Sequence, residues 1–305
     1  MVKKGYKQTE VGVVPEDWKI LKIKDIGYLT SGESPSHFEF STGHLPYFKV
    51  EQLNNSVKYQ IDTPYHTSSS KPIDMGSIIF PKRGAAISTN KFRLLAQPSL
   101  LDTNIMALTV TNEQVHNEYL FYWFIRKGLW QIADTTSVPQ INNKHILPLQ
   151  FPLPPFAEQE RIADALSDID SFLTALEKQI SKEKAIKQGA MQELLTGKRR
   201  LPGFSGEWRY FNLMKNSKVK ARIGWQGLKK SEYLDSGYAL LVIGTDFDDG
   251  RVLWDGCHYV TRSRYEQDRN IQLQNNDILI TKDGSLGKAA LVQGLTKPAT
   301  LNSGI

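Results

Sequence analysis

Residues 75–84 read Met-Gly-Ser-Ile-Ile-Phe-Pro-Lys-Arg-Gly, and residues 275–284 repeat this pattern as Asn-Asn-Asp-Ile-Leu-Ile-Thr-Lys-Asp-Gly. A second match has the same spacing of 200 residues, between Leu-Asp-Thr-Asn-Ile at 101–105 and Leu-Asn-Ser-Gly-Ile at 301–305. Upstream, Trp18 and Trp208 are 190 residues apart. A repeat of this length is a whole domain, because solenoid repeats have periods of about 20–50 residues. The sequence therefore predicts two related domains.

The bulk composition agrees with a two-domain chain that is not a membrane protein. The chain has 305 residues, which at about 150 residues per domain indicates two domains. Its single cysteine, Cys257, excludes an intramolecular disulfide, and we expect a cytoplasmic location. No apolar run approaches the roughly 18 residues that span a bilayer. The net charge of +6 is compatible with a polyanionic partner but does not require one.

The stretch between the two repeats predicts one long helix over residues 158–196. Pro154 and Pro155 stand before it and Gly197 after it, which is typical of helix boundaries. Apolar residues recur at steps of four and three, the spacing of a coiled-coil seam. The seam consists of Ile162, Leu166, Ile169, Leu173, Leu176 and Ile180.

This helix is longer than a single domain needs. At about 1.5 Å per residue, residues 158–195 would span on the order of 57 Å. An amphipathic helix packed on its own domain is the commoner arrangement, but a seam of this length favours a partner helix. We therefore expect both a spacer between the repeats and a surface for another helix.

Four segments around the helix carry a family resemblance. Residues 137–146 read Ser-Val-Pro-Gln-Ile-Asn-Asn-Lys-His-Ile, and residues 151–163 read Phe-Pro-Leu-Pro-Pro-Phe-Ala-Glu-Gln-Glu-Arg-Ile-Ala. Residues 192–204 read Gln-Glu-Leu-Leu-Thr-Gly-Lys-Arg-Arg-Leu-Pro-Gly-Phe, and residues 222–228 read Arg-Ile-Gly-Trp-Gln-Gly-Leu. Together they closely resemble specificity subunits of type I restriction–modification enzymes.

The resemblance implies a non-catalytic subunit that reads double-stranded DNA. Members of the family have an α+β fold with two target recognition domains, each reading half of a bipartite site, and long helices that set the spacing. It also implies modification (methyltransferase) and restriction subunits as partners, with S-adenosylmethionine, ATP and Mg²⁺ bound by those subunits and no cofactor on this chain.

On this basis the chain is expected to contain a first recognition domain (1–157), a spacer helix (158–196) and a second recognition domain (201–305). Ile305 is the counterpart of Ile105, so counterparts of residues 106–156 and of a second long helix are not in the sequence. We therefore expect the second domain and its helix to be incomplete.

The most basic stretch of the chain predicts a DNA contact. Residues 215–230 contain six Lys or Arg residues and no Asp or Glu. Such a stretch combines charges that neutralise phosphates with side chains that can bond to base edges. The candidates are Lys218, Lys220, Arg222, Trp225, Gln226 and Lys229. A solvated basic loop is the alternative.

A second group of candidates follows the repeated apolar strands. The dipeptide Asp-Gly at 283–284 is typical of a hairpin turn, which would place Lys82, Arg83 and Lys282 at exposed tips. Lysine at such a tip is often only solubilising, but it recurs in both copies. Further candidates beyond the first turn are Ser88, Asn90, Lys91 and Arg93.

Motifs for catalysis are not found. The nearest string to an adenine methyltransferase motif, Leu-Pro-Pro-Phe at 153–156, begins with leucine, which cannot accept a hydrogen bond from an amino group. The six histidines have no metal-ligand spacing. We expect no enzyme activity from the chain alone. The alternatives are the recognition part of a fused type IIG-like restriction–methyltransferase, a silent truncated subunit, or a protein-interaction scaffold.

The unpartnered seam leads to a prediction about assembly. A second copy of the chain or a modification subunit would cover it, and two copies related by a two-fold axis would read a palindrome with a gap.

Overall fold

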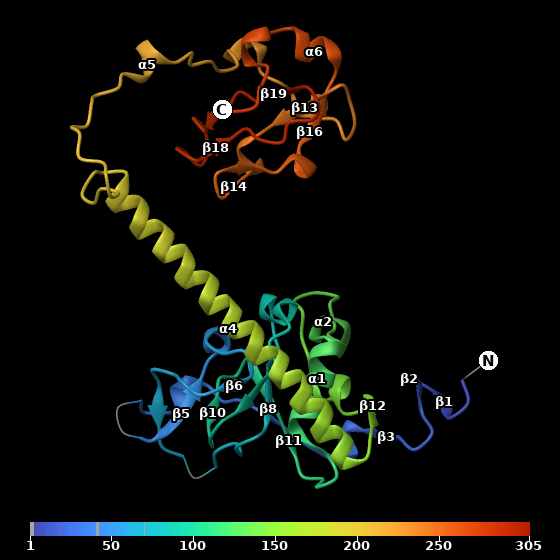
Figure 1. Ribbon diagram of the computed structural model, residues 1–305. Helices are drawn as coiled ribbons and strands as arrows, with labels where there is room; N and C mark the ends of the chain where they lie inside the picture. Colours follow the sequence, from blue (N-terminus) through green and yellow to red (C-terminus); the bar gives the residue numbers. More distant parts are fainter. Residues whose placement is uncertain (1–2, 41–42, 70) are drawn as a thin grey trace. The chain divides into compact units, whose positions relative to one another are not determined.

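The computed structural model describes residues 3–40, 43–69 and 71–305 (Figure 1). The side chain of Trp225 also lies outside the described part. The chain divides into two compact units, Met1–Thr196 (unit 1) and Gly197–Ile305 (unit 2). Both units combine strands with helices, which confirms the expected mixture of α and β structure.

Unit 1 holds most of the regular structure. Its strands are β1 (Tyr6–Thr9), β2 (Gly12–Pro15), β3 (Lys19–Lys22), β4 (Gly27–Ser31), β5 (Leu45–Phe48), β6 (Tyr59–Gln60), β7 (His66–Thr67), β8 (Ile78–Pro81), β9 (Arg93–Leu95), β10 (Leu100–Leu101), β11 (Ile105–Val110) and β12 (Gln150–Leu153). Its helices are α1 (Asn117–Lys127), α2 (Leu129–Ile132), α3 (Asn143–Ile146) and α4 (Phe156–Leu194).

A five-stranded sheet in the order β4-β11-β8-β9-β6 forms the centre of unit 1. The residues of β8 are all buried, as expected for a strand covered on both faces. Ile78 and Phe80 point to the core that lies against α1, whereas Ile79 points to a second core beneath the three-stranded sheet β10-β5-β7. The sheet therefore separates two apolar layers.

Helix α1 covers one face of this sheet with aromatic side chains. Phe124 of α1 stacks on Phe80 of β8, with 6.5 Å between the ring centroids. Glu118 lies in the first turn and Arg126 and Lys127 in the last, which complements the helix dipole. The helix ends at Gly128, whose φ of +79° is a conformation that glycine adopts without strain.

A buried glutamine fixes the start of helix α4. Gln159 is fully buried, and its amide nitrogen donates to the carbonyl oxygens of Gln114 and Pro154, at 2.9 Å each. Its amide oxygen accepts from the backbone N–H of His116 at 2.9 Å. These bonds attach the first turn of α4 to the loop before α1, so the helix direction is set at its beginning.

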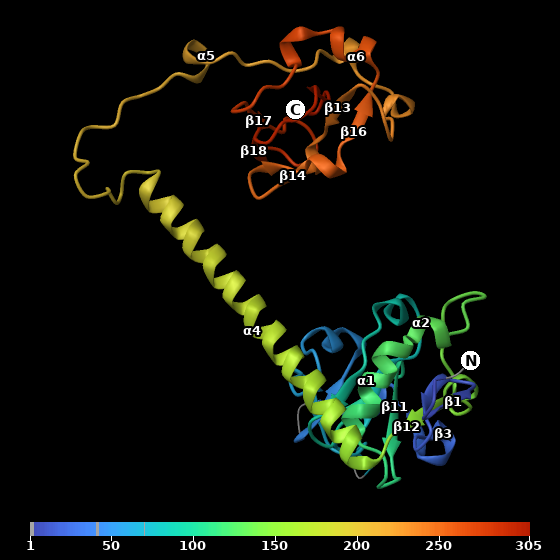
Figure 2. The ribbon, with the colours of Figure 1, turned by 45° about the vertical axis from the view of Figure 1, so that its right-hand side comes forward.

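The rest of α4 has little cover from its own unit. The helix has 39 residues, about 58 Å at 1.5 Å per residue. It starts and ends two residues earlier than the expected 158–196. In the described part of unit 1, α1 lies beside the early turns of α4 (Figures 1 and 2). Residues 171–189 of α4 are all exposed.

Unit 2 has shorter elements. They are α5 (Leu213–Asn216), β13 (Ala239–Val242), β14 (Phe247–Asp248), β15 (Arg251–Val252), β16 (His258–Val260), α6 (Arg262–Glu266), β17 (Ile278–Ile280), β18 (Ala289–Leu291) and β19 (Ala299–Leu301). They form a three-stranded sheet in the order β16-β13-β19 and a four-stranded sheet in the order β14-β15-β18-β17.

The strand pairings of unit 2 match part of those of unit 1. Strand β13 pairs parallel with β19 and antiparallel with β16, as β5 does with β10 and β7. Strand β18 pairs antiparallel with β17 and parallel with β15, as β9 does with β8 and β6. Strand β8 also pairs with β11, and β17 has no such second neighbour in the described part of unit 2.

Strands β8 and β9, and likewise β17 and β18, pair antiparallel as expected for hairpins, but the loops between them are longer than tight turns. Residues 82–92 separate β8 from β9 and include a 3-10 helix at Ala85–Thr89. In unit 2, residues 281–288 separate β17 from β18. The Asp283–Gly284 pair therefore lies within a longer loop, where Thr281 accepts from the N–H of Lys288 at 3.0 Å and donates to the carbonyl of Ser285 at 2.5 Å.

Candidate nucleic-acid interface

The loop after β8 is fixed to the end of α1 through Asn90. The Asn90 amide donates to the carbonyl of Ile125 and accepts from the N–H of Leu129, at 2.9 Å each. Its own backbone has a φ of +50°, in the left-handed region that asparagine tolerates. Asn90 was expected to contact DNA, but its amide is used to hold the loop.

Arg93, a candidate for DNA contact, is not accessible to DNA. Its side chain is buried, and its two terminal nitrogens donate to the carbonyls of Phe92 and Leu53, at 2.5 and 2.7 Å. Burial lowers the pKa of the guanidinium from its usual value. A guanidinium enclosed in this way cannot reach a phosphate, so Arg93 is structural.

The remaining candidates of this loop differ in exposure. Arg83 and Ser88 are exposed, although the Ser88 hydroxyl donates to the carbonyl of Ala85 at 2.7 Å. Lys91 is half-buried, and its ammonium donates to the side chain of Asn54. Lys82 is half-buried rather than at an exposed tip, and burial lowers the pKa of its ammonium. Arg83 is thus the most accessible charge of this loop.

Arg222, a candidate for DNA contact in the basic stretch, is also inaccessible to DNA. Only 1% of the residue is exposed. Its Nε donates to the carbonyl of Leu301 at 2.8 Å, and a terminal nitrogen donates to the Thr300 hydroxyl at 3.2 Å. Burial, followed by repulsion from Arg264, lowers the pKa of Arg222. Arg222 fastens the basic stretch to β19 instead of contacting phosphate.

The other candidates of the basic stretch fall into two groups. Lys218, Lys220 and Lys229 are exposed, as expected for groups that could reach phosphates. Gln226 is buried, which corrects its expected role at a base edge. Trp225 lies outside the described side chains, so its expected role stays a prediction.

The loop after β17 presents Lys282 to solvent. Residues 282–289 are all exposed. The N–H of Lys282 donates to the carbonyl of Gly304 at 2.9 Å, and the N–H of Lys82 donates to that of Asn104 at 2.8 Å. The two lysines thus have equivalent backbone anchors, but Lys282 is exposed whereas Lys82 is half-buried.

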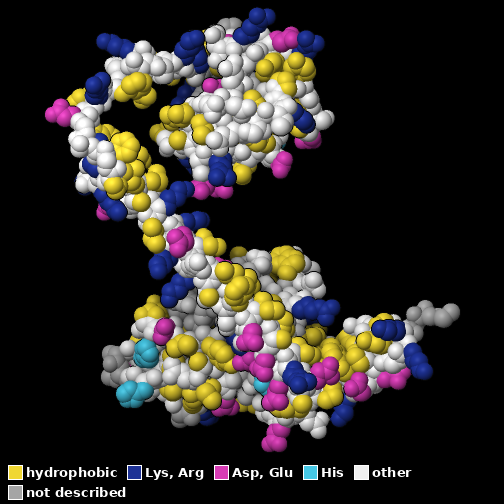
Figure 3. All heavy atoms as spheres, in the orientation of Figure 1, with side chains coloured by type: hydrophobic (Ala, Val, Ile, Leu, Met, Phe, Trp, Pro, Cys, Tyr) yellow, Lys and Arg dark blue, Asp and Glu magenta, His cyan; other side chains and the backbone are white. Residues whose placement is uncertain are grey.

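The seam residues of α4 are placed as a row on one side of the helix. Ile162 packs against the core of unit 1, whereas the other five are exposed. Figure 3 shows hydrophobic side chains along this helix. The sequence reasoning missed Phe172, which is 63% exposed and adds to the apolar surface of the helix.

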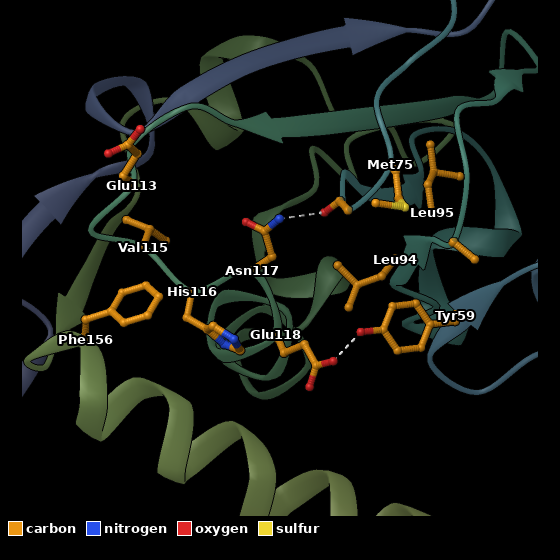
Figure 4. Close-up of a pocket in the computed structure, with 12 residues that line it drawn as sticks. Tyr59, Met75, Leu94, Leu95, Glu113, Val115, His116, Asn117, Glu118 and Phe156 are labelled. Atoms are coloured by element: carbon orange, nitrogen blue, oxygen red, sulfur yellow. Dashed lines mark hydrogen bonds between the residues drawn. The ribbon is translucent and has the colours of Figure 1, made fainter.

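A pocket of about 500 Å³ lies where β9, the start of α1 and the start of α4 meet. It is lined by Tyr59, Met75, Leu94, His116, Glu118 and Phe156, among others (Figure 4). No local pattern in the sequence pointed to this pocket, because its lining comes from five separate segments.

Glu118 at the pocket joins three elements by polar bonds. It accepts from the Lys58 ammonium and the Tyr59 hydroxyl, and Lys58 also donates to Ser167 of α4 at 2.9 Å. Burial alone would raise the pKa of Glu118, but these hydrogen bonds outweigh it and leave the pKa below its usual value. Burial and Glu118 together raise the pKa of Tyr59 to about 12. The cluster fastens α4 to the sheet.

Cys257 and Asp277 lie in environments that do not favour catalysis, and the described residues form no metal-binding cluster. Within residues 3–40, 43–69 and 71–305, no group of three or more His, Cys, Asp or Glu could hold a metal ion. Cys257 is buried, and burial raises the pKa of its thiol to about 12, which is unfavourable for a nucleophile. Asp277 accepts from the N–H of Gln274 at 2.8 Å, as a turn residue does. None of the described helices is long and apolar enough to cross a membrane.

Comparison with known proteins finds one consistent family. Residues 15–184 match the type I restriction modification DNA specificity domain. The chain is 23% identical to the type I restriction enzyme MjaVIII specificity subunit of Methanocaldococcus jannaschii, over 94% of this chain and 70% of that protein. It is 27% identical to the putative MjaX specificity subunit of the same organism, over 63% of this chain and 48% of that protein.

A solved structure is also similar. The crystal structure of the HsdS subunit from Thermoanaerobacter tengcongensis superposes with a TM-score of 0.46 and 18% identity, over 62% of this chain and 47% of that one.

Proposed function

Since the chain belongs to the family of type I restriction modification DNA specificity domains, we propose that it reads double-stranded DNA for a type I restriction–modification system. The observation that carries the proposal is the family match over residues 15–184, which spans most of unit 1 and of α4. Methylation and cleavage are then the work of modification and restriction subunits, which bind S-adenosylmethionine, ATP and Mg²⁺. The cytoplasm is the corresponding location.

We assign two recognition domains, residues 1–157 and 201–305, joined by a spacer helix over 158–196. The strand pairings that the two units share support this division, because β13 and β18 repeat the neighbours of β5 and β9. Residues 201–305 form fewer elements than residues 1–157 in the described part of the chain.

The DNA-contacting residues of this proposal are the exposed cations of the two units. In unit 2 they are Lys218, Lys220, Lys229 and Lys282, and in unit 1 Arg83 is the main one. Their ammonium or guanidinium groups can approach phosphates without unfolding any element. The buried Arg93 and Arg222 keep the loops in shape.

The test is the salt dependence of DNA binding by the chain together with its modification subunit. Replacing Lys218, Lys220, Lys229 and Lys282 by alanine should lower the slope of log K against log salt by up to about 0.9 for each phosphate that is no longer neutralised. The control replaces four exposed cations elsewhere, Lys178, Lys182, Lys184 and Lys198. An unchanged slope in the first variant, or an equal change in both, would return these lysines to a solubilising role.

We further propose that the α4 seam receives a helix of a second copy or of a modification subunit. Leu166 and Leu173 are 38% and 51% exposed, and covering a large aliphatic side chain contributes roughly 1.5–3 kcal/mol. Two copies would present two identical first domains, and the methylated site would then be symmetric and interrupted.

Methylome sequencing with this chain as the sole specificity subunit tests the seam. Leu166→Asp with Leu173→Asp should abolish methylation, because each charge would face the partner helix. Ser171→Asp with Lys178→Asp, on the opposite side of α4, is the control and should retain it. An asymmetric motif, or full activity of the seam variant, would contradict assembly through this row.

A further inference from the structure

Three segments of unit 1, which we call the basic surface, carry an excess of positive charge. They are residues 82–92, 126–130 and 134–144, and together they contain six Lys or Arg residues and one acid, Asp134. The excess is not visible in any one stretch of sequence, because each segment contributes only one to three of the cations. A cluster of one sign of charge attracts a partner of the opposite sign.

Hydrogen bonds hold the three segments together. The N–H of Gly84 donates to the carbonyl of Pro139, and the N–H of Ile141 donates to that of Lys82, at 2.8 Å each. The side chain of Asn90 joins the same loop to the end of α1 and the start of α2. Segments that are distant in the sequence therefore form one surface with a fixed backbone.

Residues 134–140 form a closed loop within this surface. Asp134 and Gln140 exchange two backbone hydrogen bonds, of 2.9 and 3.0 Å. The Asp134 carboxylate accepts from the N–H and the hydroxyl of Thr136, at 3.1 and 2.8 Å. These bonds lower the pKa of Asp134 below its usual value. The one acid of the basic surface thus gives the loop its shape.

The closed loop presents polar side chains that the fold does not use. Thr135, Ser137 and Gln140 are exposed, and their side chains have no hydrogen-bond partner within the part of the chain that the structure describes. Serine, threonine and glutamine side chains can bond to base edges in a DNA groove. The amide of Asn90, in contrast, is already bonded to the backbone.

Exposed cations lie in all three segments. Arg83, Arg126 and Lys144 are exposed, one from each segment. Trp130 of α2 is 51% exposed and adds an aromatic face. In protein–DNA complexes, contacts to phosphates position the protein and contacts to base edges specify the sequence. The basic surface contains side chains for both kinds of contact.

We infer that the basic surface is the DNA-reading face of unit 1. Arg126 and Lys144 bind phosphates, and the closed loop contacts base edges through Thr135, Ser137 and Gln140. Because the backbone of the loop is already fixed by hydrogen bonds, little ordering is needed on binding. The inference rests on the proposed function, since it names the residues by which unit 1 would carry it out.

An acidic protein surface is the other partner that the charge alone would fit. The unused hydroxyl and amide groups beside the cations favour DNA, because base pairs differ in the donors and acceptors that they offer to such groups. The experiments below therefore measure sequence preference and protein assembly separately.

The first experiment selects sequences from a random duplex library with the full chain and its modification subunit. Thr135→Ala with Ser137→Ala and Gln140→Ala should lower the preference for the selected sequence over unrelated DNA by at least about tenfold, because contacts to base edges are lost. Gln97→Ala with Thr111→Ala is the control, since both residues are exposed in unit 1 outside the basic surface. The control should keep the preference of the parent.

The second experiment measures the salt dependence of binding to any duplex. Arg126→Ala with Lys144→Ala should lower the slope of log K against log salt by about 0.9 for each phosphate that is no longer neutralised. Lys19→Ala with Lys71→Ala, two exposed lysines of unit 1 outside the basic surface, should leave the slope unchanged. Circular dichroism checks that all variants remain folded.

The outcomes separate the inference from the proposed function. A parent complex that selects no sequence would overturn both. A parent complex that selects a sequence, together with a triple variant that selects it equally well, would overturn the inference alone, as would an unchanged salt slope for Arg126→Ala with Lys144→Ala. Loss of the modification subunit from that double variant, in size-exclusion chromatography without DNA, would assign the surface to a protein contact and would also overturn the inference.

Discussion

Strands β8 and β17 have closely similar sequences and pair in the same way with the strand that follows each of them. The two nevertheless differ in what surrounds them, because β8 has a strand and a helix beside it that β17 lacks among the described residues. The same apolar pattern is therefore core in one unit and surface in the other. The pattern of a strand thus indicates its two faces, but its neighbours decide whether those faces are buried.

The largest expected effect concerns this pair of strands. Phe80→Ala should lower the unfolding free energy of unit 1 by about 3–5 kcal/mol, because it leaves a cavity in a fully buried core. Ile280→Ala should change that of unit 2 by about 0.5 kcal/mol or less, as for other surface positions. Differential scanning calorimetry of the full chain measures both. Equal losses would show that β17 is covered in solution.

A smaller effect is expected from the buried arginine of unit 2. Arg222→Ala should destabilise unit 2 by about 2–3 kcal/mol, since it removes charged hydrogen bonds and leaves the Leu301 carbonyl without its donor. Lys220→Ala, two residues away and exposed, should cost about 0.5 kcal/mol or less. Urea unfolding followed by circular dichroism compares the two. A drop in DNA affinity for Arg222→Ala without any drop in stability would restore its assignment as a phosphate contact.

The smallest effect concerns the turn after β5 and its counterpart after β13. Gln52 accepts from the N–H of Lys49, and Asp246 accepts from that of Ile243, at 2.8 Å each. Asp246 is buried, and burial raises its pKa above the usual 3.8. Because the pKa is raised in the folded state, the carboxyl contributes most to the free energy of unfolding of unit 2 below pH 3.8. This contribution is lost as the pH rises through the folded-state pKa.

Asp246→Asn should therefore stabilise unit 2 at pH 7 by about 0.5–2 kcal/mol, the range of single stabilising substitutions. The gain should shrink as the pH is lowered towards 3.8, where the aspartate is protonated in both states. Thermal unfolding between pH 3.5 and pH 7 measures this gain in stability. Gln52→Glu in unit 1 makes the opposite change, from an amide to a carboxyl. A gain that does not depend on pH would contradict the role given to the carboxyl.

Regular features of the molecule could be predicted from the sequence, and individual side-chain roles could not. The position of α4 follows from proline, glycine and apolar spacing, which are local signals. Arg93 and Arg222 look like surface cations in sequence, but carbonyl groups from distant residues, such as Leu53 and Leu301, bind them. The pocket at Glu118 was missed for the same reason, because Lys58 and Ser167 come together only in the fold.

The three hydrogen bonds of Gln159 have a consequence far from where they are made. Leu194 is 35 residues further along the same helix, about 52 Å at 1.5 Å per residue. A tilt of about 5° at the base of a straight helix of this length displaces its tip by about 4–5 Å, slightly less than the radius of a helix with its side chains. A small change in the position of Gln159 would therefore produce a much larger displacement at the far end of α4.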